Sequence, residues 1–239
     1  MLKAVTFSSH GEEVHGTLII PQKLKNKNPG VVLIHGFGSN EKNYIPLGER
    51  LAEIGIVAFT INLRGHKGNN NVEDFLKVKD GFEDGLASFD FLTSFEFIDK
   101  ERIGICGASF GGGICAYVSG RRKVKSIVLR APATYSDYLL NLTLPEILKE
   151  EGDKFNNMEN IFDTIPIKSL EEFKGYLLII TSENDEVIPK RMTDAFLHAA
   201  RNAAHKDLTK IKDATHGLDN DIWKEKFRHL TIDWFQKTL

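Results

Sequence analysis

The stretch ERIGICGASFGGGICAYVS, from Glu101 to Ser119, gives the strongest indication of the fold of this chain. Its first part, Arg102 to Cys106, is a short apolar run with two β-branched isoleucines, which predicts a buried strand. A Gly-Ala-Ser-Phe-Gly segment follows at 107–111, and apolar side chains then recur at helical spacing up to Val118. We therefore expect a strand, a tight turn and a helix in immediate succession.

The predicted turn places Ser109 between the strand and the helix. Gly107 and Gly111 carry no Cβ, so the backbone can come close to itself on both sides of the serine. The serine also lies at the N-terminus of a helix, where backbone N–H groups face developing negative charge. This context is typical of a nucleophilic serine. The alternative is a glycine-rich turn with a structural serine, and the two are separated by whether the chain supplies a base, an acid and an oxyanion hole.

Composition and charge argue against some classes of protein, namely those that bind nucleic acids or membranes. The 239 residues are 41% hydrophobic and carry 31 basic and 33 acidic side chains, for a formal net charge of −2. This balance does not indicate a nucleic-acid partner or binding to an anionic membrane surface. No apolar run reaches the roughly 18 residues of a membrane helix, and the N-terminus lacks the apolar segment of a signal peptide.

The two cysteines, Cys106 and Cys115, both lie in apolar surroundings. One ends the predicted strand and the other lies inside the following helix. We expect buried free thiols in a reducing compartment rather than a disulfide bond. Together with the missing signal peptide, this favours a cytoplasmic protein.

Strands and helices are predicted to alternate along most of the chain. Apolar and alternating runs predict strands at 6–7, 14–20, 30–34, 56–61, 102–106, 124–129, 176–181 and 208–211. Amphipathic patterns predict helices at 42–54, 72–97, 189–202 and 220–237, in addition to the helix after Ser109. This alternation indicates an α/β fold with a mostly parallel sheet of about eight strands and helices on both faces. Ligands bind such sheets at the carboxyl ends of the strands.

Residues 131–173 interrupt the alternation. The segment has no clear strand, several aromatic side chains and patterns for two short helices. We interpret it as a cap inserted between two strands of one domain that spans 1–239. Aromatic residues in the segment are candidates for lining a substrate pocket, although they could equally pack between cap and sheet. These are Tyr135, Tyr138, Phe155 and Phe162.

Two further polar sites follow predicted strands and could serve Ser109. A serine hydroxyl needs a base within hydrogen-bond reach, and His216 after the last strand can supply one. Asp185, in the loop after the preceding strand, can hold that histidine in the required tautomer and stabilise its charged form. Asp137, which follows an earlier strand, and Asp213, three residues before the histidine, are alternative acids.

With these residues identified, the chain resembles the serine hydrolases of the α/β-hydrolase fold along nearly its whole length. Four motifs carry the resemblance: HGFG at 35–38, GASFGG at 107–112, NDEVIP at 184–189 and THG at 215–217. Within that superfamily the chain is similar to small carboxylesterases, including feruloyl and cinnamoyl esterases, and to the catalytic domains of prolyl-oligopeptidase-like acyl peptidases. Four motifs in this order are specific for the fold and much less specific for the substrate.

The resemblance implies a role for each of these residues. Ser109 would be the nucleophile, His216 the base and then the acid for the leaving group, and Asp185 the carboxylate that orients the histidine. The backbone N–H groups of Phe37 and Phe110 would form the oxyanion hole. No metal or cofactor is implied.

Two other histidines have alternative interpretations. His35 and His66 could ligate a metal, but no acidic or cysteine partners lie at a matching spacing. We expect His35 to shape the oxyanion loop through side-chain hydrogen bonds and His66 to order a loop near the pocket.

These inferences predict a serine esterase that cleaves small carboxylic esters through an acyl-enzyme on Ser109. An acyl- or dipeptidyl-peptidase-like amidase is the nearest alternative. A catalytically weak binding protein on the same fold is a second alternative, against which an intact triad argues, because a pure binding protein does not need one.

Overall fold

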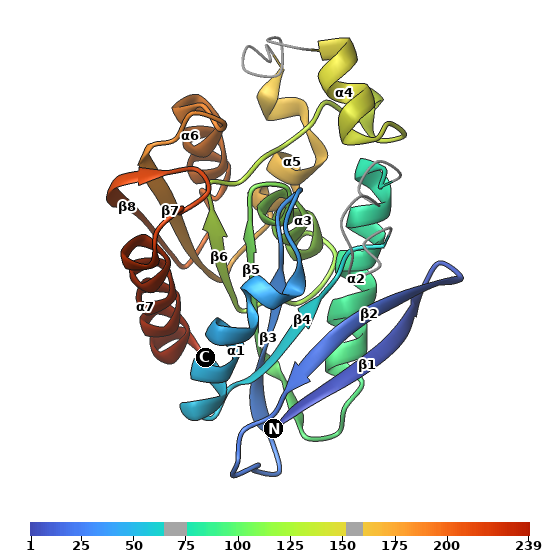
Figure 1. Ribbon diagram of the computed structural model, residues 1–239, viewed down its shortest axis with the longest axis vertical. Helices are drawn as coiled ribbons and strands as arrows, with labels where there is room; N and C mark the ends of the chain where they lie inside the picture. The colour runs from blue at the N-terminus through green and yellow to red at the C-terminus, as the bar shows by residue number, and fades with distance from the viewer. Residues whose placement is uncertain (65–75, 152–159) are drawn as a thin grey trace.

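An eight-stranded sheet runs through the protein. The computed structural model describes residues 1–64, 76–151 and 160–239 (Figure 1). The strands are β1 (Leu2–Ser9), β2 (Glu12–Ile19), β3 (Asn28–Ile34), β4 (Val57–Ile61), β5 (Ile98–Ala108), β6 (Ser126–Arg130), β7 (Tyr176–Asn184) and β8 (His205–Thr215). Their order across the sheet is β1-β2-β4-β3-β5-β6-β7-β8. The β1–β2 and β2–β4 pairs are antiparallel and the remaining pairs are parallel, which confirms the predicted α/β architecture.

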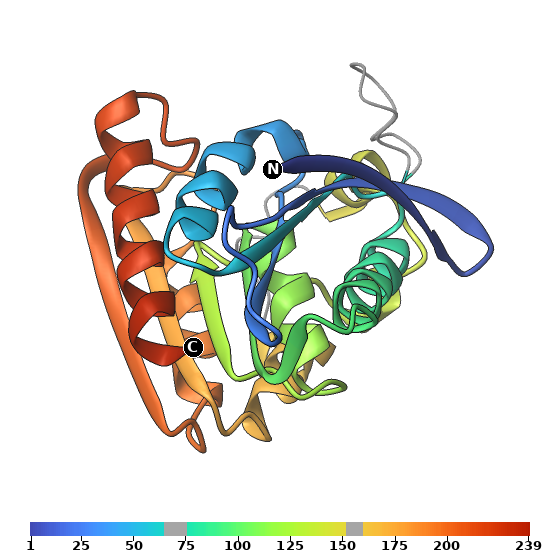
Figure 2. The ribbon, with the colours of Figure 1, turned by 90° about the horizontal axis from the view of Figure 1, so that it is seen from below.

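Helices cover both faces of this sheet. They are α1 (Ile45–Glu53), α2 (Val78–Thr93), α3 (Phe110–Ser119), α4 (Leu144–Glu151), α5 (Ile165–Glu171), α6 (Lys190–Ala199) and α7 (Asp221–Thr238), with 3₁₀ turns η1 (Glu41–Asn43), η3 (Asp137–Leu139) and η5 (Ile161–Asp163). Figure 2 shows α1 and α7 on one side of the sheet and α2 and α3 on the other. None of the helices in the described residues is long and apolar enough to cross a lipid bilayer.

The central strands are apolar throughout because both of their faces are covered. On β3, Val31 and Leu33 belong to the core that α1 and α7 complete. Their neighbours Val32 and Ile34 point the other way, into the core shared with α2 and α3. All four side chains are fully buried. This alternation explains why the run at 30–34 shows no polar residue.

The N-terminal boundary of α1 differs from the prediction. The side chain of Asn40 accepts the N–H of Lys42 at 3.0 Å and so caps η1 rather than the longer helix. The α-helix itself begins at Ile45, with Pro46 in its first turn. Proline fits there because the first N–H groups of a helix have no intrahelical acceptor. The predicted helix at 42–54 is therefore a 3₁₀ turn followed by a shorter α-helix.

Two other predicted segments are described only in part. The helix expected at 72–97 is α2, which ends at Thr93, and its first predicted turn lies outside the described residues. The segment 131–173 contains α4 and α5, the two short helices that the sequence indicates. Phe155 lies outside the described residues, and the role of the segment as a cap stays a prediction.

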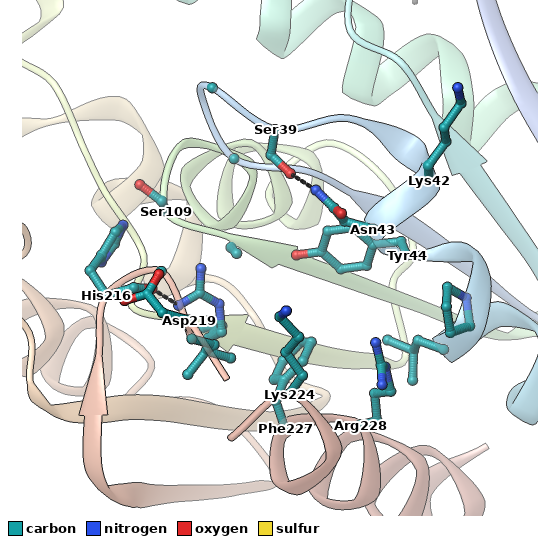
Figure 3. A pocket seen from close by; sticks show the side chains of 18 of the residues that line it. Ser39, Lys42, Asn43, Tyr44, Ser109, His216, Asp219, Lys224, Phe227 and Arg228 are labelled. Atoms are coloured by element: carbon teal, nitrogen blue, oxygen red, sulfur yellow. Dashed lines mark hydrogen bonds between the residues drawn. The ribbon is translucent and has the colours of Figure 1, made fainter. Parts of the chain in front are cut away.

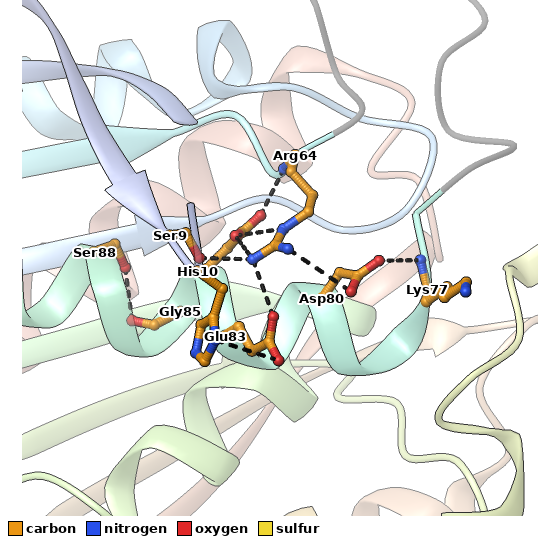
Figure 4. Close-up of polar contacts among 9 residues, drawn as sticks. Ser9, His10, Arg64, Lys77, Asp80, Glu83, Gly85 and Ser88 are labelled. Atoms are coloured by element: carbon orange, nitrogen blue, oxygen red, sulfur yellow. Dashed lines mark hydrogen bonds and ion pairs between the residues drawn. The ribbon is translucent and has the colours of Figure 1, made fainter. Parts of the chain in front are cut away.

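A charged cluster joins Arg64, three residues after the end of β4, to helix α2 (Figure 4). The Asp84 side chain is fully buried, and it accepts hydrogen bonds from Nε and Nη2 of Arg64 at 2.9 and 2.8 Å. Glu83 and Asp80 lie 3.2 and 3.8 Å from the same guanidinium, which also donates to Ser9 Oγ at 2.7 Å. Burial raises the pKa of Asp84, and the hydrogen bonds from Arg64 oppose that rise. The cluster therefore fixes the chain where it leaves the sheet after β4.

The variant Asp84→Ala should lower the free energy of unfolding by about 3–5 kcal/mol, because Arg64 would lose its closest buried partner. Asp90→Ala is the matched control on the same helix, since Asp90 pairs with Arg122 at the surface. An exposed pair contributes about 0–1 kcal/mol. Chemical denaturation of both variants measures the difference, and equal losses would contradict a structural role for the buried cluster.

Candidate active site

Ser109 is the single residue between β5 and α3, as the sequence predicts. Its backbone has φ 51° and ψ −119°, a conformation that costs a non-glycine residue about 1–3 kcal/mol and persists only where the surroundings impose it. The surroundings here are hydrogen bonds. The Ser109 N–H donates to the Arg130 carbonyl at 2.9 Å, and the Ser109 carbonyl accepts the N–H of Ala133, also at 2.9 Å.

The two glycines of the turn are required by close backbone contacts. A Cβ on Gly107 would overlap the carbonyl group of Gly111. A Cβ on Gly111 would overlap the carbonyl oxygens of Ile34 and His35, which follow along β3 into the next loop. Any side chain at either position would therefore force apart the strand, the helix and the neighbouring loop.

Asp185 and His216 meet at the carboxyl ends of the neighbouring strands β7 and β8. His216 Nδ1 lies 3.0 Å from each carboxylate oxygen of Asp185. Because a carboxylate only accepts, Nδ1 carries the proton and Nε2 is left as the acceptor of the neutral ring. Both side chains are largely shielded from solvent, at 15% exposed for the histidine and 10% for the aspartate.

The surroundings of Asp185 favour its charged form. Burial acts to raise the pKa of this carboxyl, but the hydrogen bond from His216 and those from the N–H groups of Ile188 and Val187 outweigh it. The two backbone bonds measure 2.8 and 3.0 Å. The pKa therefore lies below its usual range, and the carboxylate can stabilise a positive charge on the histidine.

The side chains of the two alternative acids are not hydrogen bonded to His216. Asp137 accepts the N–H of Ile165 at 3.1 Å and so belongs to the contacts within segment 131–173. The backbone N–H of Asp213 donates to Glu183 at 2.9 Å, and its side chain is exposed. Of the three carboxylates, Asp185 is the one hydrogen bonded to the His216 ring.

His35 shapes the loop after β3. Its Nε2 accepts the N–H of Leu63 at 3.1 Å, so Nδ1 carries the proton and donates to the Gly36 carbonyl at 2.7 Å. Both ring nitrogens are thus engaged in holding the loop, which agrees with the predicted role. His66 lies outside the described residues. Within the described ranges, no group of three or more His, Cys, Asp or Glu side chains is placed to hold a metal ion.

The loop after β3 brings Phe37 to the turn that holds Ser109. The Phe37 and Phe110 rings lie edge to face with centroids 6.3 Å apart. Phe110 is the first residue of α3, so its backbone N–H has no acceptor within the helix. Phe37 and Ser109 both line one cleft, so a substrate oxygen next to the serine would lie close to this loop.

The cleft has a volume of about 600 Å³ and runs from Ser109 between the loop before α1 and the start of α7. Figure 3 shows Ser109 and His216 at one end of it, and Lys42 and Arg228 at the other. Its polar and aromatic lining side chains include Ser39, Lys42, Asn43, Tyr44, Arg130, Asp219, Asp221, Lys224, Phe227 and Arg228. A cleft of this size suits a small molecule.

Three of the aromatic side chains expected in a pocket, Tyr135, Tyr138 and Phe162, are not among the described residues that line this cleft. Tyr135 is 5% exposed and packs its ring against Phe110, with centroids 5.8 Å apart. Tyr138 and Phe162 are 68% and 51% exposed, and the Phe162 ring contacts His198 of α6. Tyr135 therefore packs against the first residue of α3, and Tyr138 and Phe162 lie at the surface of segment 131–173.

The sequence prediction missed Arg130, the last residue of β6. One guanidinium nitrogen donates to the His216 carbonyl at 2.6 Å, and the guanidinium lies near the Tyr44 hydroxyl. A usable signal was present in the sequence. Arg130 is the charged end of the apolar strand Ser126–Arg130, at the sheet edge where ligands bind.

Residues 49–239 match the model of the prolyl oligopeptidase family. Among curated relatives, the uncharacterized peptidase YuxL of Bacillus subtilis is 24% identical over 254 residues, which cover 96% of this chain and 38% of that protein. The thermostable monoacylglycerol lipase of Bacillus sp. strain H-257 is 22% identical over 240 residues, which cover 91% of this chain and 94% of that protein. This chain therefore spans less than half of the first relative and nearly all of the second.

Solved structures with the same fold include both peptidases and other hydrolases. The acylaminoacyl peptidase of Pyrococcus horikoshii superposes with a TM-score of 0.75 at 22% identity, covering 100% of this chain and 42% of that one. The dienelactone hydrolase of Anabaena variabilis gives a TM-score of 0.72 at 19% identity, covering 100% and 98% of the two chains. These likenesses show the α/β-hydrolase fold. Because the family model takes in the Ser109 turn and the loops of Asp185 and His216, this hydrolase belongs to the prolyl oligopeptidase family.

Proposed function

We propose that the protein is a serine hydrolase that cleaves small carboxylic esters through an acyl-enzyme on Ser109. One observation carries the proposal. The His216 ring is bound through Nδ1 to Asp185 and lines the same cleft as a serine held in a strained turn. This combination provides a base next to a serine whose conformation the fold imposes.

Each of the proposed catalytic residues has a role in the steps of ester cleavage. His216 Nε2 takes the proton of the Ser109 hydroxyl while the oxygen attacks the ester carbonyl, and Asp185 stabilises the resulting imidazolium. The N–H groups of Phe37 and Phe110 bind the oxyanion of the tetrahedral intermediate, where one such donor contributes about 2.7–4 kcal/mol. The imidazolium then protonates the departing alkoxide. Water, activated by the same histidine, hydrolyses the acyl-enzyme and restores the serine.

Esters are favoured over amides because of the leaving group. An amine departs only after it has been protonated, which requires the substrate to be held in register along its length. An alkoxide or phenoxide departs with less help, so a cleft of about 600 Å³ that orients a small molecule suffices. The lipase and the dienelactone hydrolase, whose lengths this chain nearly matches, are consistent with this choice. The amidase alternative is supported by the names of the two longer relatives.

Ser109→Ala should reduce kcat for 4-nitrophenyl butyrate by about 10⁶-fold, as removal of the nucleophile does in a protease with this triad. It should also abolish labelling by a fluorophosphonate probe, because the probe forms its bond with the serine oxygen. Ser39→Ala, which removes another hydroxyl from the same cleft, is the control and should still be labelled. Labelling of the Ser109→Ala protein would contradict the assignment.

Asp185→Asn should reduce kcat/KM by about 10⁴-fold, because the amide can donate to Nδ1 and so favours the wrong histidine tautomer. It should also change how stability depends on pH. The folded-state pKa of Asp185 is depressed, so its contribution to stability is present above the unfolded value near 4 and lost as the pH falls through the folded value. Between pH 7 and pH 3 the wild type should lose more unfolding free energy than the variant. Parallel stability curves would contradict this linkage.

A matched ester and anilide distinguish the esterase from the amidase. We expect kcat/KM for 4-nitrophenyl butyrate to exceed that for butyryl 4-nitroanilide by several orders of magnitude. A dipeptide anilide with a free amino group tests the dipeptidyl-peptidase alternative in the same assay. Cleavage of either anilide as fast as the ester would replace the ester proposal with the amidase.

A further inference from the structure

Arg130 occupies a central position between the residues proposed for catalysis. Its backbone carbonyl accepts the N–H of Ser109 at 2.9 Å, and its guanidinium donates to the carbonyl of His216 at 2.6 Å. The side chain lines the cleft and is only partly exposed. A guanidinium group is therefore held at the end of the cleft where the reaction would occur.

The charge of Arg130 has no carboxylate partner in the part of the chain that the structure describes. Its side chain donates to a neutral oxygen, the His216 carbonyl, and the hydroxyl of Tyr44 lies nearby. Tyr44 is 6% exposed, and burial raises the pKa of its hydroxyl, which stays neutral. A partly buried arginine is normally paired with an anion, because burying a lone charge is costly. A guanidinium has five N–H donors, so some remain for a ligand in the cleft.

Two other cations of the cleft, unlike Arg130, have a carboxylate partner. Lys224 lies 3.5 Å from Asp221, and Arg228 is paired with Glu225 on the same helix. Both cations therefore have a carboxylate neighbour, which in the case of Arg228 is shared with Arg50.

Two further side chains of opposite charge line the cleft. Lys42 adds an exposed positive charge at the far end of the cleft. Asp219, the remaining carboxylate of the lining, accepts a hydrogen bond from Thr215 at 2.5 Å. Among the cations of the lining, Arg130 is thus the one at the Ser109 end of the cleft, and no ion pair joins it to a carboxylate of the described residues.

We propose that Arg130 forms a carboxylate-binding subsite and that the preferred ester carries a carboxylate on its leaving group or its acyl group. This inference rests on the proposed esterase function and names its substrate class. The planar guanidinium matches a carboxylate in a paired, charge-assisted geometry. The bond to the His216 carbonyl keeps the group in place at the lining of the cleft.

Pairs of esters that differ only in charge test the subsite. For the leaving group, 4-acetoxybenzoate is compared with 4-acetoxybenzamide. For the acyl group, 4-nitrophenyl hydrogen adipate is compared with 4-nitrophenyl hexanoate. We expect the wild type to favour the charged member of at least one pair by about 10- to 100-fold in kcat/KM, the usual contribution of a charge-assisted hydrogen bond.

Arg130→Gln should bring that preference close to one. Loss of the contact to the His216 carbonyl could slow both esters of a pair, but such an effect cancels in their ratio, so the ratio reports carboxylate binding alone. Arg130→Lys keeps the charge without the planar group and should retain part of the preference, which also covers the case in which the glutamine variant does not fold. Arg228→Gln is the matched control, with the same charge removed from the same cleft, and should keep the wild-type ratio.

Three results would overturn the subsite. They are a wild-type ratio near one for both pairs, an unchanged ratio in both Arg130 variants, and an equal loss of preference in Arg228→Gln. Ester hydrolysis that depends on Ser109 would still support the proposed function in each case. If none of the four esters is cleaved, the function fails separately. Calorimetry with 4-hydroxybenzoate and 4-hydroxybenzamide on the Ser109→Ala protein then tests the subsite without turnover, and equal binding of the two would overturn it.

Discussion

The close packing of backbone around Ser109 is the constraint on which the rest of the site depends. The serine holds a positive φ because its N–H and carbonyl are bound to the chain just after β6. Gly107 and Gly111 allow the strand, the helix and the loop after β3 to approach each other without side chains between them. Strain of this kind persists only where the surrounding structure imposes it, so the parallel sheet around β5 is what holds the serine in this conformation.

A series of hydrogen bonds also fixes the loop that carries Phe37. Arg64 is fixed to the buried Asp84 of α2, and the preceding residue, Leu63, donates its N–H to His35. His35 in turn donates to the carbonyl of Gly36, the residue before Phe37. The loop conformation thus depends on contacts with the end of β4, about 30 residues further along the chain.

Local patterns in the sequence were sufficient for most of the fold. The apolar runs predicted the central strands because a strand covered on both faces has no polar side to obscure the signal. The edge strands β1 and β8 are mostly exposed, and they were predicted only over 6–7 and 208–211. Boundaries were less well predicted where local chemistry changes the backbone, as at Asn40, which caps a 3₁₀ turn instead of α1. The sequence could predict that Ser109, Asp185 and His216 lie together, because each follows a strand and the carboxyl ends of parallel strands meet at one edge of the sheet.

The sequence by itself determined the sheet, the strained turn and the pairing of Asp185 with His216, since each depends on residues close to strand ends. Only the tertiary structure decided which side chains line the cleft. Tyr44, Arg130 and Lys224 come from three separate elements, and no spacing along the chain relates them. The aromatic residues of segment 131–173 looked suitable by composition, but composition cannot say which way a side chain faces. The packing of α1 and α7 on one face of the sheet determines which side chains line the cleft, and it leaves the open space beside Ser109 among charged residues.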